Sequence, residues 1–126
     1  MKRLAFALFL SATLVVPALA LDLDHQITLI DGKPILDQAG KPQPMVLGDI
    51  LKNTLLITDQ QMTKEVKNYH FWLAVKIGKA QEEHKKDFTL TTQELADVED
   101  ALWKYQSILV AGQAIKLIDP SFQPPK

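Results

Sequence analysis

The sequence predicts a mainly α-helical protein, with a short N-terminal β-hairpin followed by about four helices packed around a central helix. Three observations support this fold class. Residues about 60–80 are apolar nearly all round when they are placed on a helix, which is typical of a helix covered on several sides. Thr91 and Glu94 have the spacing of a capping box that opens another helix. The strand-like pattern is confined to the stretch from Asp24 to Asp37.

The first 20 residues have the features of a cleaved signal peptide. Lys2 and Arg3 are positively charged, and an uncharged, mostly apolar run of 13 residues follows from Leu4 to Val16. Ala18-Leu19-Ala20 is an A-x-A cleavage site. A membrane anchor needs about 20 apolar residues to cross the hydrocarbon core, so the run is short for one. We therefore expect a periplasmic or secreted protein with no membrane association after cleavage.

Composition excludes several classes of function. Without the leader, 12 basic residues stand against 15 acidic ones, a net charge of −3, and no arginine remains because Arg3 is the only one. A mildly acidic chain without guanidinium groups is poorly suited to bind phosphates or base edges, so we expect no nucleic-acid partner. The chain has no cysteine, which excludes thiol nucleophiles, thiolate metal sites and disulfides.

The hairpin is predicted from alternation and turn chemistry. Ile27 and Leu29 alternate with polar residues, and Asp31-Gly32 is a favoured two-residue turn in which both central positions need positive φ. Pro34 cannot donate to a strand ladder, so we expect a short hairpin or a sheet edge.

The first two helices are predicted from apolar periodicity. One apolar face indicates a helix at about 46–57, and Thr58-Asp59 supplies capping atoms for the central helix at about 60–80. Gly78, or the polar residues after it, would end the central helix.

The last two helices follow the capping box. Leu90 and Leu95 stand where a hydrophobic staple places them. Whether residues 92–118 form one helix or two stays open, but one unbroken helix of about 40 Å would exceed the width of a domain of this size. That length favours a break near Gln106-Ser107. The predicted core residues of the two helices are Leu95, Val98, Leu102 and Tyr105, then Ile108, Ala111, Ile115 and Ile118. We expect residues 21–119 to form a single small domain and 120–126 a loose Pro-rich tail.

Catalytic chemistry is not indicated. His84 has no second histidine four residues away, no G-x-S-x-G elbow surrounds Ser107 or Ser121, and the five glycines are isolated. We therefore expect no enzyme, no cofactor and no bound metal. Trp72 and Trp103 belong to two aromatic groups for which core packing is favoured, and they are also the candidate interaction anchors.

A resemblance is carried by short segments in order along residues 26–119. These segments are Ile30–Ile35, Leu47–Ile50 with Leu55-Leu56, Leu73–Ile77, Leu90-Thr91, and Leu109–Ala114 with Leu117–Asp119. They resemble small uncharacterised proteins encoded in phage and prophage genomes. That group carries no catalytic motif, so the resemblance implies no site residues, and its members begin at the hairpin without an export signal.

The leading hypothesis is an exported soluble protein that acts as a protein–protein interaction module, of phage or prophage origin. One alternative is a phage assembly or virion accessory protein, for which the leader is incidental. A second alternative is a small periplasmic enzyme or ligand carrier.

The predicted signal peptide can be tested by the mass of the exported protein. Protein recovered from the periplasm should begin at Leu21, because cleavage follows Ala20. Intact-mass spectrometry measures this directly. An Ala20→Arg control should keep its leader, since the cleavage site requires a small residue. Exported protein that retains Met1 would contradict cleavage and favour an anchored form.

Overall fold

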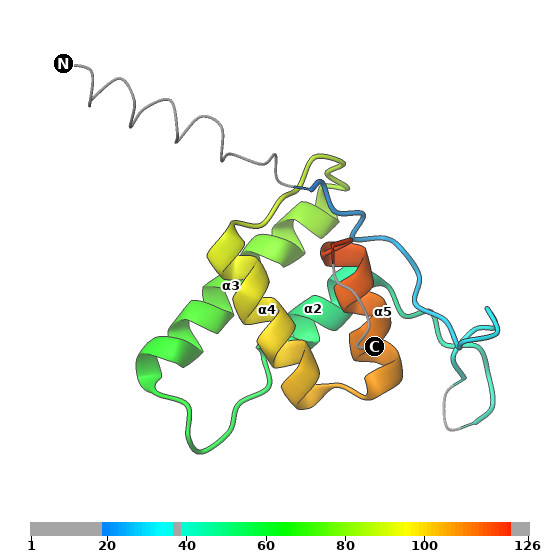
Figure 1. Ribbon diagram of the computed structural model, residues 1–126, viewed down its shortest axis with the longest axis horizontal. Coiled ribbons are helices and arrows are strands. Elements are labelled where there is room, and N and C mark those ends of the chain that lie inside the picture. Colours follow the sequence, from blue (N-terminus) through cyan, green and yellow to red (C-terminus); the bar gives the residue numbers. More distant parts are fainter. Residues whose placement is uncertain (1–18, 37–38, 122–126) are drawn as a thin grey trace.

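The computed structural model describes residues 19–36 and 39–121, and it confirms the mainly helical fold class. The described helices are α2 (Leu47–Leu55), α3 (Lys64–Glu82), α4 (Thr92–Tyr105) and α5 (Ile108–Ile118) (Figure 1). Nearly all of the predicted signal peptide and most of the predicted tail lie outside the described residues. Among the described helices, none is long and apolar enough to cross a membrane.

The helix at the centre of the fold is α2. It packs against both α3 and α4, and α5 packs in turn against α4. Most of its nine residues are buried, namely Leu47, Gly48, Ile50, Leu51, Thr54 and Leu55. The one buried polar side chain among them is satisfied, because the Thr54 hydroxyl donates to the Ile50 carbonyl at 2.6 Å and accepts from Gln106 Nε2 at 2.8 Å. The predicted helix at 46–57 is thus confirmed, and it lies in the interior of the fold.

The predicted central helix exists as α3, but the prediction that it is covered on several sides is wrong. It buries a single stripe, formed by Leu73, Ala74, Ile77 and Ala80. Phe71, Trp72 and Val75 lie on the opposite side of the helix and are exposed. The error has a simple cause: α2 covers α3 from one direction, so the apolar residues at the back of α3 have nothing over them.

The N-terminal end of α3 differs from the prediction, and its C-terminal end agrees with the longer of the two predicted ends. The N-cap is Thr63, whose hydroxyl accepts from the Val66 N–H at 3.1 Å, rather than Thr58-Asp59. The helix continues through Gly78 to Glu82, and His84, just after the C-cap Glu83, has a φ of 53°. The Lys85 N–H then reaches back to the Ala80 carbonyl at 3.0 Å, which is the longer bond of a Schellman motif. Histidine thus fills a left-handed position that glycine commonly takes.

The predicted start of α4 and the break before α5 are confirmed. Thr91 and Glu94 form both hydrogen bonds of the capping box. Tyr105 ends α4, and Ser107 caps α5 by accepting from the Val110 N–H at 3.3 Å. The prediction that Ile108 is a core residue is wrong, since this residue is 84% exposed in the first turn of α5.

The N-terminal segment lies along the helices, and the β-hairpin predicted within it stays a prediction. Leu21, Leu23 and Ile27 are buried, and isolated antiparallel bridges such as Thr28 with Pro34 take the place of strands. The predicted turn spans three residues, because the Leu29 N–H donates to the Lys33 carbonyl at 2.9 Å. Gly32 supplies the positive φ there.

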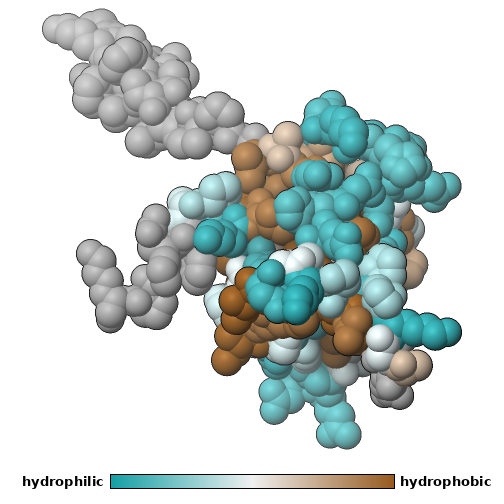
Figure 2. All heavy atoms as spheres, turned by 90° about the vertical axis from the view of Figure 1, so that its right-hand side faces the viewer, coloured by the Kyte–Doolittle hydropathy of each residue, from teal (hydrophilic) through white to brown (hydrophobic). Residues whose placement is uncertain are grey.

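The same segment fixes the start of α2. No side chain caps this helix; instead its first N–H groups donate to carbonyls of the N-terminal segment, Leu47 to His25 and Gly48 to Leu23, both at 2.8 Å. Gln113 of α5 holds the segment from the other side through two hydrogen bonds with the Thr28 backbone. The face that carries this segment shows apolar side chains reaching the surface among polar ones (Figure 2).

Core packing around α2 can be tested with two leucines. Leu51 is fully buried, so Leu51→Ala should lower the free energy of unfolding by about 2–5 kcal/mol. Leu56, at the end of the same helix, is 52% exposed, and Leu56→Ala should change it by less than about 0.5 kcal/mol. Urea unfolding measures both values. Similar midpoints for the two variants would contradict the central position of α2.

Candidate interaction surfaces on α3

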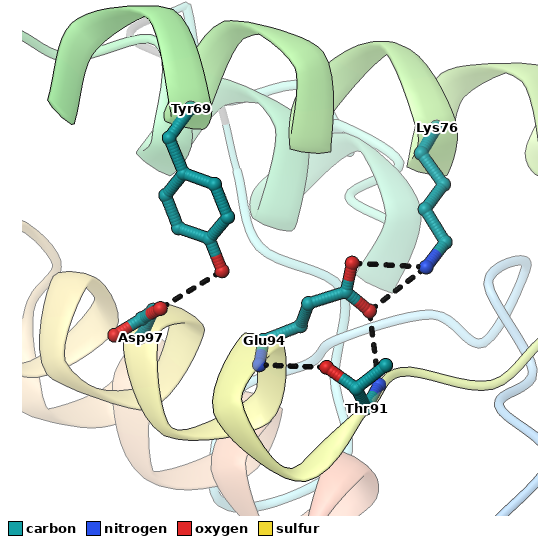
Figure 3. Close-up of polar contacts among 5 residues, drawn as sticks. All are labelled: Tyr69, Lys76, Thr91, Glu94 and Asp97. Atoms are coloured by element: carbon teal, nitrogen blue, oxygen red, sulfur yellow. Dashed lines mark hydrogen bonds and ion pairs between the residues drawn. The ribbon is translucent and has the colours of Figure 1, made fainter. Parts of the chain in front are cut away.

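The two long helices α3 and α4 are joined by a row of polar side chains, which we call the polar seam (Figure 3). Tyr69 Oη donates to Asp97 at 2.8 Å, and Lys76 Nζ donates to both carboxylate oxygens of Glu94 at 2.8 and 3.0 Å. The pairing order shows that the helices run antiparallel, because the earlier residue of α3 contacts the later residue of α4. The seam therefore fixes one flank of α3 while leaving its outer side free of α4.

Glu94 serves two elements of the seam at once. Its side chain accepts from the Thr91 N–H at 2.9 Å, which completes the capping box, and it also binds Lys76. Burial raises the pKa of this carboxyl, but the bonds from the Lys76 ammonium and the Thr91 N–H outweigh burial, so its pKa lies below the ordinary value. The start of α4 is thus tied to the middle of α3.

Tyr69 is a stable donor in the same seam. Burial, and then its hydrogen bond to the Asp97 carboxylate, raise the pKa of Tyr69 to about 12. The phenol consequently stays protonated at every physiological pH and acts as a structural donor rather than as a proton carrier.

Beyond Tyr69, the space between α3 and α4 opens into a groove of about 370 Å³. Its lining combines apolar side chains with three carboxylates and one ammonium group: Met62, Val66 and Ala101 with Asp59, Asp97, Asp100 and Lys104. The excess of negative charge favours cationic groups over anions. His70 also lines the groove, and its Nδ1 is buried without a hydrogen-bond partner among the described residues.

The Asp59 carboxylate in this groove already accepts hydrogen bonds from other residues of the fold. Its carboxylate accepts from the Tyr105 hydroxyl, from Lys104 Nζ at 2.9 Å and from the Gln61 N–H at 2.9 Å. The hydrogen bond from Tyr105, followed by that from Lys104, lowers the pKa of Asp59 to about 2. The network holds the α2–α3 connection against the end of α4.

The histidines do not converge on one site. His84 lies 3.4 Å from an Asp24 carboxylate oxygen at the surface, whereas His70 lines the groove. Across the described ranges, no group of three or more histidine, aspartate or glutamate side chains is placed to share a metal ion.

The outer side of α3 carries an exposed apolar cluster, which we call the aromatic face: Phe71, Trp72 and Val75. These side chains are 48%, 59% and 40% exposed. The Phe71 and Trp72 rings contact each other edge to face, with centroids 5.2 Å apart. The favoured prediction that this aromatic pair packs in the core is therefore wrong, because α2 covers only the opposite side of α3.

Trp72 and Trp103 lie on different helices, α3 and α4. Trp103 is 46% exposed on α4, so the prediction that it packs in the core is wrong as well. At 100° per residue it lies about 120° around α4 from Asp97, the residue that faces α3. The α4 positions one turn before Trp103, Glu99 and Asp100, are polar, whereas Val75 extends the apolar surface around Trp72. Of the two predicted anchors, only Trp72 belongs to a cluster of exposed apolar side chains on its own helix.

Comparison of the chain with protein-family models, with curated proteins and with solved structures gives no match in any of the three. The resemblance to phage and prophage proteins stays a prediction.

The Asp59 network predicts a specific pH dependence. The native pKa of about 2 lies below the ordinary value of 3.8, so between these values the unfolded chain binds the proton first. The free energy of unfolding should therefore fall as the pH is lowered from about 4 to about 2. Asp59→Asn should flatten this part of the profile, measured by urea unfolding at several pH values. A Gln60→Ala control should keep the original slope, and equal slopes in all three proteins would count against the network.

Proposed function

We propose that this protein is an exported protein-binding module and that the aromatic face of α3 is its interaction surface. The observation that carries the proposal is the cluster of Phe71, Trp72 and Val75 exposed on a well-formed helix. Contiguous exposed apolar surface marks interaction sites, and tryptophan is enriched among the residues that dominate binding energy. A rigid helix presents these side chains at low entropic cost on binding.

The groove between α3 and α4 supports a catalytic or carrier role less well. Asp59 and Asp97, two of its three carboxylates, are already bound to side chains of the fold. The one hydroxyl of a serine or threonine in its lining, that of Thr63, caps α3. The groove therefore offers no activated nucleophile, and the aromatic face is the better candidate for the protein's main contact.

Export in this proposal rests on the leader, from Lys2 through the A-x-A site. A phage or prophage origin is part of the same proposal and rests on the segment resemblance. The leader alone argues for a partner in the periplasm or outside the cell.

A photo-crosslinking amino acid placed at residue 72 tests the interaction surface in living cells. The matched control carries the same group at residue 103, also a tryptophan and also exposed, but on α4 away from the aromatic face. We expect a discrete protein adduct from position 72 that is absent from position 103. Mass spectrometry of the adduct identifies the partner.

A second pair of variants links the adduct to the aromatic face. Val75→Asp should remove the adduct formed at position 72, because a charge in the centre of an apolar contact is strongly disfavoured. Lys85→Asp, on the surface beyond α3, should leave it intact. No adduct from position 72, or equal adducts from both positions, would overturn the proposal.

A further inference from the structure

We infer that the partner bound by the aromatic face is a second copy of this chain, with the two α3 helices packed antiparallel. This inference rests on the proposed function, since it names the partner of the same surface. It is carried by a symmetry in the sequence of α3 and by the charges at its two ends.

Two pairs of exposed residues on α3 are placed symmetrically about Leu73. Phe71 and Val75 are equally distant from Leu73, and so are Lys64 and Glu82, the first and last residues of the helix. Lys64 and Glu82 are also about five full turns apart, and at 100° per residue both fall on the line of the helix between Phe71 and Val75. A two-fold axis at the level of Leu73 therefore places Phe71 beside Val75 of the second copy.

The same axis places the end charges in opposite-sign pairs. Lys64 of each copy comes to lie beside Glu82 of the other, once at each end of the helix pair. Both residues are exposed, and neither forms an ion pair with another described residue. A parallel arrangement would instead put lysine beside lysine, which is repulsive.

These two charges have the wrong sign for an isolated helix. The helix dipole favours negative charge at the N-terminus and positive charge at the C-terminus, yet α3 begins with Lys64 and ends with Glu82. Glu65 and Lys79, in the first and last turns, have the favourable sign, so the two terminal residues are the exceptions. An antiparallel partner corrects both at once, because it brings a negative side chain to the lysine and a positive one to the glutamate.

The contact is small enough to be reversible. An α-helix of 19 residues is about 28 Å long, and one pair of such helices stands at the lower end of specific interface sizes. We therefore expect a concentration-dependent equilibrium between monomer and dimer rather than a permanent assembly.

Sedimentation equilibrium of the purified mature protein tests self-association directly. Trp72→Ala should weaken the dimer about 30-fold or more, as loss of an interface hot spot does, while Trp103→Ala should leave it unchanged. Lys64→Glu should weaken it roughly 3- to 10-fold, since it creates two like-charge contacts, and adding Glu82→Lys should restore it. Circular dichroism confirms that each variant keeps its helix content.

Disulfide trapping tests the antiparallel register. The chain has no cysteine, so introduced thiols are the only ones present. Lys64→Cys mixed with Glu82→Cys should give the mixed disulfide in excess over either symmetric one, because only the mixed pair comes within disulfide distance. Lys64→Cys mixed with Lys85→Cys should show no such excess.

The outcomes separate this inference from the proposed function. A monomer at every concentration, together with a position-72 adduct to a different protein, would overturn self-pairing and leave the interaction surface standing. A dimer that survives Trp72→Ala, or that traps Lys64→Cys with itself, would overturn the antiparallel α3 contact. A monomer with no adduct from position 72 would overturn both.

Discussion

The burial of α2 is the constraint on which the rest of the structure depends. A nine-residue helix is too short to be stable alone, so its formation depends on tertiary contacts. The N-terminal segment supplies carbonyls to its first N–H groups, and Gln106 completes the bonding of its buried Thr54 hydroxyl. Gly48 allows close approach of α3, since a Cβ there would lie 2.6 Å from the Gln81 side chain. The contacts that bury α2 and satisfy its hydrogen bonds therefore determine where these neighbouring segments lie.

This arrangement determines which surfaces of α3 are left for binding. Since α2 approaches α3 from one side and the polar seam holds a flank through Tyr69 and Lys76, the outer side remains uncovered. The seam consists of charge-assisted hydrogen bonds between partly exposed groups, which add orientation more than stability. A rigid, oriented helix with an open apolar side is the form in which a helix face binds another helix.

The predictions that succeeded from sequence depend on neighbouring residues. Thr91 and Glu94 define the start of α4 because both partners of each capping bond lie within one turn. The break at Gln106-Ser107 followed from the size of the domain. The failures concern residues distant in sequence: Asp59 was expected to cap a helix, and instead it binds Tyr105 from 46 positions away. Periodicity likewise showed that residues about 60–80 are apolar nearly all round, but the burial of each side depends on what covers it.

The exposed side of α3 departs from what folding alone would favour. Its aromatic cluster gains little from the folded state, because its side chains remain in contact with water. Its terminal charges, Lys64 and Glu82, oppose the helix dipole. Elsewhere local signals agree with the fold, as in the capping box of α4 and the Schellman motif of α3. Sequences that break local rules without compensation within the fold do so mainly at functional sites. In α3 the terminal charges lie on one line with Phe71 and Val75, and a single partner surface, apolar at its centre and oppositely charged at its ends, would resolve both departures together.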